Sequence, residues 1–167
     1  MRGCDMIRHF IAFTAFALCA LAGLGRSRLA KRRCELLAEL VRLLAGFSVK
    51  IRCTAPTLAE LIEQENGLFA QLVHEKRAAG DIRAAWAAGC GRLAELPFCH
   101  KEEAALMQAL GQALGKSDRA GAVQTLGLYE GQLSALYEAA RAEYAEKGRL
   151  FRSVGALCGL GAAIMMW

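Results

Sequence analysis

The chain has 167 residues, of which 55% are hydrophobic but only 7% aromatic, and it contains two prolines. Helix-forming Ala, Leu, Glu and Arg are abundant, and runs of the β-branched and aromatic residues that favour strands are absent. This composition excludes a β-rich fold. The length suits one domain with accessory segments, and we expect an all-α protein.

The net charge of +5 is divided unevenly along the chain. Residues 1–33 hold seven basic and one acidic side chain, and residues 147–167 hold three basic ones, so these flanks carry +9 and the middle carries −4. A nucleic-acid surface needs clustered Lys and Arg with stacking aromatic residues on the folded domain. The basic residues instead border the two ends, and we expect no nucleic-acid partner.

The first apolar segment, residues 10–25, is an uncharged run of sixteen. A membrane-spanning helix needs about twenty residues, but flanking arginines can snorkel to the interface. Five basic residues follow in 26–33, and such charge is retained in the cytoplasm. We therefore predict an uncleaved transmembrane anchor over residues 1–25. The alternative is a secreted helical adaptor whose signal peptide is cleaved after Ala22, so that it begins at Gly23.

Residues 26–152 predict a cytoplasmic bundle of about six helices with short connections. Thr57 and Glu60 form a capping-box pattern, and Asp81 has a side chain suited to an N-cap. The predicted short helices cover Leu29 to about Arg52, Thr57–Glu65, Leu68–Ala79, Asp81–Leu96 and Lys101–Leu114. The first should bury one broad face formed by Leu36, Leu37, Leu40, Leu43, Leu44 and Phe47.

No proline interrupts the last fifty residues, from Asp118 to Trp167. Ser117 or Asp118 can cap a helix here. An apolar or small stripe at helical spacing, broken by Glu130, contains Val123, Leu126, Leu133, Tyr137, Ala140, Tyr144, Gly148 and Phe151. The residues after Ser153 are apolar. We predict one long helix that begins in the bundle and continues into a C-terminal transmembrane segment over 153–167.

Small residues recur at steps of four in both apolar segments. Gly155 and Gly159 form a GxxxG pattern near the C-terminus, and Cys19 and Gly23 belong to a matching stripe in the first segment. Small residues let helix backbones approach closely in lipid. The two stripes predict packing between the spans of one chain, or between subunits of a homo-oligomer.

The search for catalytic motifs is mostly negative. The sequence has neither a glycine-rich phosphate loop nor a GxSxG nucleophile elbow. Glu102 and Glu103 are adjacent, so they project about 100° apart on a helix and cannot pair across a cleft. We assign both to a solvated face.

The remaining chemical candidate is Cys90, Cys99 and His100, with Cys53 or His74 as a further ligand. Zinc takes thiolate and imidazole ligands, usually in closely spaced pairs, which this spacing lacks. The seven cysteines are scattered without a CxxC, which favours a reduced compartment and small buried side chains. We expect no cofactor. A thiol- or metal-dependent, membrane-anchored protein that uses this trio is the alternative function.

The order of elements also resembles a known family. Its distinctive features here are a Leu-Gly pair, a nearby Asp, a Gln six residues later and a glycine-containing terminal span: Leu114, Gly115, Asp118, Gln124, and Val154-Gly155 through Gly159-Leu160. In these respects the chain resembles the stage III sporulation protein AB family.

The resemblance implies a non-enzymatic role in the channel complex between mother cell and forespore. The protein would lie in the mother-cell membrane around the forespore, with its middle domain in the cytoplasm. That domain is similar to the cytoplasmic domain of the type II secretion inner-membrane platform protein. The implied partners are other sporulation channel proteins and a cognate secretion-type ATPase. No catalytic residue carries over from the family.

Overall fold

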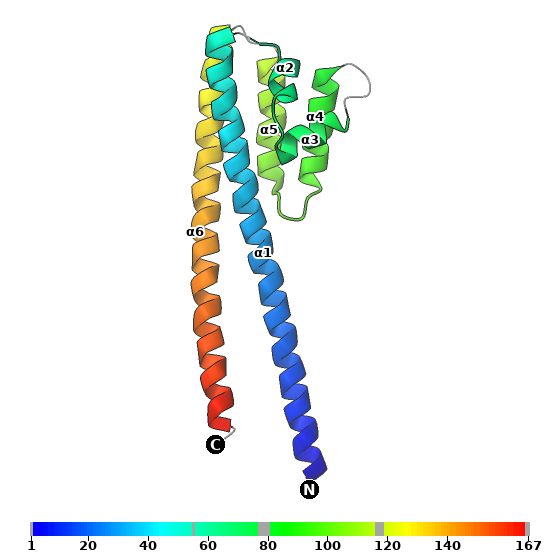
Figure 1. The fold of residues 1–167 in the computed structure, drawn as a ribbon, viewed down its shortest axis with the longest axis vertical. Helices are drawn as coiled ribbons and strands as arrows, with labels where there is room; N and C mark the ends of the chain where they lie inside the picture. The colour runs from blue at the N-terminus through cyan, green and yellow to red at the C-terminus, as the bar shows by residue number, and fades with distance from the viewer. Residues whose placement is uncertain (1, 55, 77–80, 116–118, 166–167) are drawn as a thin grey trace. The chain divides into compact units, whose positions relative to one another are not determined.

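The computed structural model describes the backbone of residues 2–54, 56–76, 81–115 and 119–165, and the side chains of 25–54, 56–76, 81–115 and 120–148. Over these residues the fold is all-α, as predicted, with no strand (Figure 1). The six helices are α1 (Arg2–Thr54), α2 (Leu58–Glu63), α3 (Leu68–His74), α4 (Ile82–Ala94), α5 (Lys101–Leu114) and α6 (Arg119–Met165). The first and last helices each combine a bundle segment with one end of the chain.

The chain divides into two compact units. One unit comprises both ends, Met1–Lys31 and Ala142–Trp167, and the other comprises Arg32–Arg141. Among the described residues, no helix combines the length and the hydropathy needed to cross a membrane. The predicted division at residues 25/26 and 152/153 stays a prediction.

The predicted caps at the starts of two helices are confirmed. The Thr57 hydroxyl accepts from the Glu60 N–H at 3.4 Å, and the Glu60 carboxylate accepts from the Thr57 N–H at 3.0 Å. Asp81 Oδ1 accepts from the Arg83 N–H at 2.9 Å. These bonds satisfy N–H groups that have no partner within the helix. The proposed caps Ser117 and Asp118 lie outside the described residues.

Three helices end earlier than predicted. The last residues of α2, α3 and α4 are Glu63, His74 and Ala94, where Glu65, Ala79 and Leu96 were expected. In each case the chain tightens into a turn with an N–H bonded to the carbonyl three residues back: Glu65 to Ile62, Lys76 to Val73, and Leu96 to Leu93. Such tightening is common at helix ends and leaves no signal in the hydrophobic period. The bounds of α5 match the prediction.

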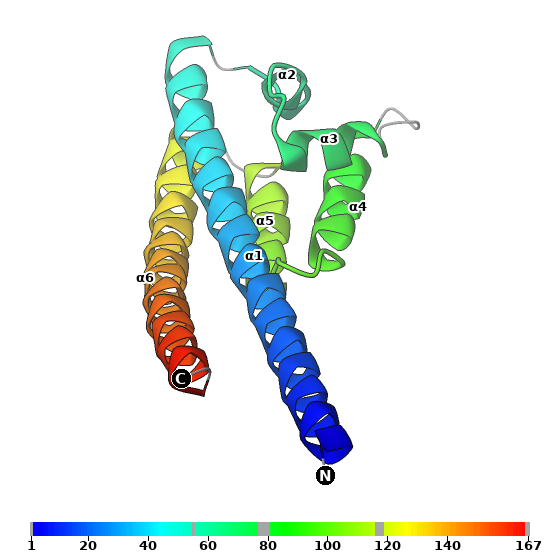
Figure 2. The ribbon, with the colours of Figure 1, turned by 60° about the horizontal axis from the view of Figure 1, so that its bottom comes forward.

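The core of the Arg32–Arg141 unit is one cluster of buried side chains from all six helices. The predicted apolar face of α1 is confirmed, since all six of its residues are buried. On α6, Leu126, Leu133 and Ala140 are buried at steps of seven, as the stripe predicted, whereas Tyr144 is exposed. Figure 2 shows α3, α4 and α5 side by side, in agreement with the contacts between successive short helices.

A carboxylate from α1 caps α3. Gly67 is the N-cap residue of α3 and offers no side chain, and Glu39 Oε1 accepts from the Phe69 N–H at 3.4 Å. A Cβ atom on Gly67 would lie 2.9 Å from Glu39 Cδ, so a larger residue there would have to displace the Glu39 carboxylate from this cap. Gly67 itself has an ordinary extended φ of −69°.

Glycines also bring α3, α4 and α5 together. A Cβ on Gly89 of α4 would lie 2.8 Å from Val73 Cγ2 of α3. A Cβ on Gly111 of α5 would overlap the five-membered ring of Trp86, which projects from α4. Both helix pairs therefore pack at a distance that excludes a methyl group at these positions.

We predict that Gly111→Ala destabilises the fold by about 1–3 kcal/mol, because the added methyl overpacks against Trp86. Gly127→Ala is the matched control, since Gly127 lies on α6 with no atom within 4 Å of its added Cβ. It should instead gain about 1 kcal/mol of helix propensity. Thermal unfolding followed by far-UV circular dichroism measures both. Equal stabilities of the two variants would contradict the close packing of α4 on α5.

Candidate functional site

The candidate thiol and metal residues do not form a site. Cys90 is buried in α4 and Cys99 is buried just before α5, whereas His100 is exposed as the N-cap residue of α5. Cys53 and His74 are exposed on other helices. Among the described residues, no three His, Cys, Asp or Glu side chains are grouped to hold a metal ion. The alternative function is therefore not supported.

Burial also suppresses the reactivity of the two inner thiols. Desolvation raises the pKa of Cys90 to about 12. Desolvation and, second to it, the negative charge of Glu103 raise the pKa of Cys99 to about 12. The thiolate is the nucleophile and the metal ligand. Both residues are therefore inert thiols at neutral pH, as expected of small buried side chains.

We predict that iodoacetamide at pH 8 modifies exposed Cys53 and leaves Cys90 and Cys99 unmodified in the folded protein. With a pKa near 12, about one inner thiol in ten thousand is ionised at that pH. Peptide mass spectrometry after timed alkylation measures each site. Repetition in denaturant provides the control, because all three thiols should then react. Modification of Cys99 at the rate of Cys53 in the native protein would show that burial does not protect it.

The assignment of Glu103 to a solvated face is wrong. Its side chain is 0% exposed, whereas Glu102 is exposed. Glu103 lies on the buried face of α5 with Met107 and Leu110, at helical steps of four and three. This spacing was visible in the sequence and could have identified Glu103 as an inward-facing acid.

The Glu103 carboxylate joins two distant parts of the chain. Its Oε1 lies 2.7 Å from Arg33 Nε of α1, whose side chain is 12% exposed. Its Oε2 accepts from the His100 N–H at 2.9 Å and so caps α5. A buried charge is costly unless it is paired and hydrogen-bonded, and both oxygens of Glu103 have partners. Arg33, which the sequence assigned to a membrane border, is thereby committed to the fold.

We predict that Arg33→Met destabilises the protein by about 3–5 kcal/mol, because it leaves the Glu103 charge buried without its cation. Arg33→Met combined with Glu103→Leu should recover much of this loss, since the double variant buries no lone charge. Arg92→Met is the control, because the Arg92–Glu95 pair is solvent-exposed and should contribute less than about 1 kcal/mol. Denaturant unfolding measures all four proteins. A double variant no more stable than Arg33→Met would argue against a simple ion pair.

Trp86 is held rigidly between α3 and α5. Its indole Nε1 donates to the Met107 carbonyl at 2.8 Å, a buried hydrogen bond. Its ring meets Phe69 edge-on, with centroids 4.8 Å apart and planes at 74°. A buried indole needs a partner for its N–H, and an edge-to-face contact is a favoured aromatic geometry. The ring position is therefore set by both neighbouring helices.

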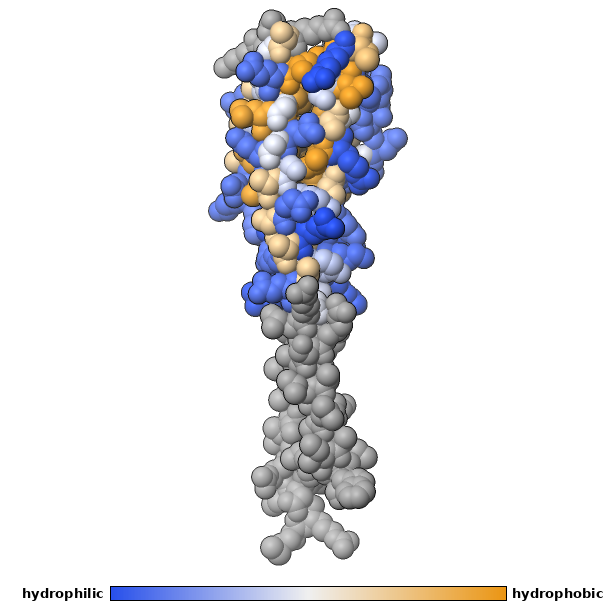
Figure 3. Space-filling view, turned by 90° about the vertical axis from the view of Figure 1, so that its left-hand side faces the viewer, coloured by the Kyte–Doolittle hydropathy of each residue, from blue (hydrophilic) through white to orange (hydrophobic). Residues whose placement is uncertain are grey.

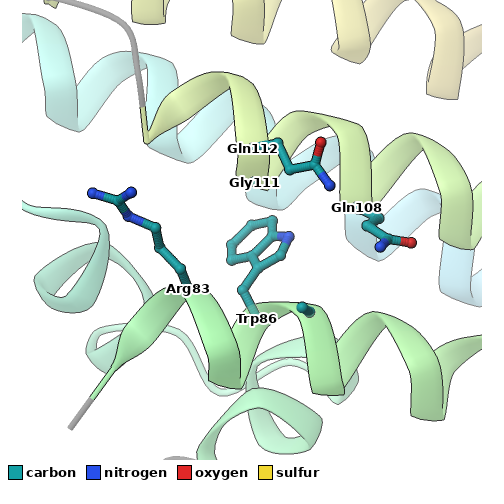
Figure 4. A pocket seen from close by; sticks show the side chains of 6 residues that line it. Arg83, Trp86, Gln108, Gly111 and Gln112 are labelled. Carbon is teal, nitrogen blue, oxygen red and sulfur yellow. The ribbon is translucent and has the colours of Figure 1, made fainter.

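A small pocket lies over the Trp86 ring between α4 and α5. Its volume is about 70 Å³. The lining residues are Arg83, Trp86 and Ala87 of α4 and Gln108, Gly111 and Gln112 of α5 (Figure 4). The Gly111 backbone packs directly against the indole ring, which is only 2% exposed. The opening is therefore bordered mainly by the exposed side chains of Arg83, Gln108 and Gln112.

A second hollow is more open and lies beside α1. It is lined by Glu39, Arg42, Leu43, Glu65 and Gly67. Glu39 is the cap of α3, and the Glu65 carboxylate lies 2.7 Å from Lys50 Nζ. Its acidic groups are thus engaged in holding α1 to the short helices.

The residues of the family resemblance occupy separate places. Leu114 packs partly buried against the core, Gly115 is the C-cap of α5, and Gln124 is exposed on α6. Asp118 lies outside the described residues. The predicted contact between the spans involves Cys19, Gly23, Gly155 and Gly159. These four positions also lie outside the residues whose side-chain surroundings the structure describes.

A family model described as stage III sporulation protein AB matches residues 8–167. The chain belongs to this family. The match covers nearly the whole chain, and it confirms the family resemblance suggested by Leu114, Gly115, Asp118, Gln124 and the glycine-containing terminal span. Comparisons with curated proteins and with solved structures found no match.

The surface of this stage III sporulation protein AB family member carries several exposed apolar side chains. The exposed large apolar side chains of the described residues are Leu29, Val49, Leu128 and Tyr144. Figure 3 shows one face of the molecule, on which apolar atoms emerge among charged ones. Leu128 is 61% exposed on α6, next to Gly127, whose surroundings are open. Exposed apolar side chains that are scattered singly are normal on a protein surface.

Proposed function

We propose that this stage III sporulation protein AB family member is a non-enzymatic membrane scaffold. It would be a platform component of the channel complex between mother cell and forespore. The family match over residues 8–167 supports a sporulation role. The observation that carries the scaffold role is the separation of the chain into a helical unit, Arg32–Arg141, and a second unit that contains both ends. A docking domain with a two-segment anchor has this organisation.

The membrane part of the proposal depends on the sequence flanks. Residues 10–25 and 153–167 are the proposed spans, and the basic residues beside each lie on the side of the middle domain. Retention of positive charge in the cytoplasm places the middle domain there and both termini outside. Gly155 and Gly159, with Cys19 and Gly23, would form the contact between spans or between subunits. The grouping of both ends in one compact unit supports such a pair.

The proposed partners are a cognate secretion-type ATPase and other membrane proteins of the sporulation channel. The basis is the resemblance of the middle domain to the cytoplasmic domain of secretion platform proteins. The chemistry of the Arg32–Arg141 unit agrees with a docking role. Its one fully buried carboxylate, among the described residues, is committed to Arg33 and His100. Its inner thiols are inert.

We predict that a tag on the surface of the Arg32–Arg141 unit recovers the ATPase and the sibling membrane proteins from sporulating membranes. Mass spectrometry identifies the proteins, and a tagged membrane protein of another system is the control. Recovery of neither the ATPase nor the siblings would contradict the platform role.

The topology is tested with the protein produced in the plasma membrane of non-sporulating cells, where the outer side of the membrane faces the medium. In a variant that retains only Cys53, a membrane-impermeant maleimide should react only after the cells are lysed, because Cys53 is exposed on the middle domain. A variant that retains only Cys4 is the matched control and should react in intact cells. Reaction of Cys53 in intact cells would place the middle domain outside. A mature chain that begins at Gly23 would contradict the N-terminal anchor.

A further inference from the structure

Basic residues border the two proposed spans at matching distances along the helices. Residues 25–31 and 147–153 are helical and together contain six basic side chains and no acidic one. We call these six residues the basic collar: Arg26, Arg28, Lys31, Lys147, Arg149 and Arg152. At a rise of about 1.5 Å per residue, each lies within about 9 Å of the nearer end of a span, measured along its own helix. The headgroup layer on each side of a bilayer is about 5–8 Å thick, so long basic side chains at these positions can reach it.

Both halves of the basic collar belong to the same compact unit. That unit comprises Met1–Lys31 and Ala142–Trp167, and the helical unit begins only at Arg32. The positive charge of the collar is therefore concentrated in the unit that contains both proposed spans. The proposed docking unit carries none of the six residues.

The two described arginines of the collar are not engaged in the fold. Arg26 and Arg28 are exposed, and no hydrogen bond or ion pair joins either side chain to another described residue. Arg33, a few positions further along α1, instead lies 2.7 Å from Glu103. At about 100° per residue, Arg26 and Arg28 project about 200° apart. The helix thus presents cations on two sides, which suits a layer of anions around it better than a single bound ion.

An apolar side chain lies exposed among these cations. Leu29 is 41% exposed, and it shares a helix face with Arg26, three positions earlier. Leu36 lies on the same face seven positions later and is only 2% exposed. The apolar face of α1 therefore continues beyond the core that covers it. Arginine stems can lie along apolar surface while their charged ends stay in a polar layer, so this segment matches the boundary between hydrocarbon and headgroups.

We propose that the basic collar binds the headgroups of anionic phospholipids. Guanidinium binds phosphate through two parallel N–H donors, and basic side chains next to a span are attracted to an anionic membrane surface. A lipid surface accounts for the exposure of Leu29 as well as for the cations, whereas a free anion accounts only for the cations. The inference rests on the proposed membrane anchor and deepens it, because it names the class of lipid that the anchor selects.

The test is native mass spectrometry of the full-length protein in dodecyl maltoside, titrated with dioleoylphosphatidylglycerol or with dioleoylphosphatidylcholine. The two lipids have the same acyl chains and differ in headgroup charge, so the ratio of their Kd values measures the preference for charge. We expect the anionic lipid to bind about fivefold more tightly. The preference should weaken as the salt concentration rises, because salt screens exposed charges.

A variant with four neutralised arginines should lower this preference to less than about twofold. Its substitutions are Arg26→Gln, Arg28→Gln, Arg149→Gln and Arg152→Gln. The matched control loses the same charge from exposed positions of the helical unit: Arg42→Gln, Arg83→Gln, Arg92→Gln and Lys101→Gln. The control should keep the fivefold preference. The salt dependence of the unsubstituted protein provides a second measurement that requires no variant.

Equal Kd values for the two lipids, or a preference that salt does not weaken, would overturn the proposal. So would an equal loss of preference in the control variant, because the charge of the whole protein would then be responsible. Displacement of the anionic lipid by glycerophosphoglycerol at the same concentration would show a site for free phosphate, and displacement by an oligothymidine would show a nucleic-acid surface. Recovery of the ATPase from membranes without lipid preference would refute the collar alone. Lipid preference without recovery of partners would refute the platform role alone.

Discussion

The apolar face of α1 is the surface on which the short helices depend. α2 has six residues and α3 has seven, and isolated helices shorter than about 12–15 residues are marginal in water. They persist because their buried side chains join those of α1 in one cluster. Three polar contacts of α1 add to this burial. Arg33 pairs with Glu103 of α5, Glu39 caps the start of α3, and Lys50 pairs with Glu65 in the turn after α2. The short helices are thus held from one side by α1 and from the other by glycine-mediated contacts among themselves.

The sequence predicted what depends on neighbours along the chain. The face of α1 followed from its period, and the caps at Thr57 and Asp81 followed from residues two or three positions away. The ends of α3 and α4 were misplaced because the closing three-residue turns carry no compositional mark. Even so, the helices were recognised by type and order, since Gly, Pro and Asn separate them clearly.

The candidate site was less accessible to such reasoning because its contacts join distant residues. Glu103 and Arg33 are 70 positions apart, and neither residue alone indicates that the other lies opposite. The close packing of Trp86 requires the absence of a side chain on a different helix, at Gly111. The cysteines agree with the preferred prediction of small buried side chains, and burial removes the reactivity of Cys99 that the alternative function needed. For Glu103 and for the cysteines, the deciding quantity is burial by residues that are distant in the sequence. The chemistry of a residue and its neighbours along the chain does not reveal this burial.

The ion pair between Arg33 and Glu103 also helps to determine how α1 is aligned along the core. The apolar face of α1 nearly repeats after four residues: a slip of that length would place Leu40 where Leu36 packs, Leu44 where Leu40 packs, and Phe47 where Leu43 packs. Hydrophobic burial alone would discriminate poorly among these alignments. The same slip, however, would bring Leu37 or, in the other direction, Leu29 opposite Glu103 and strand its charge in the core. This contact therefore favours one alignment of α1, together with the contacts of Glu39 and Lys50.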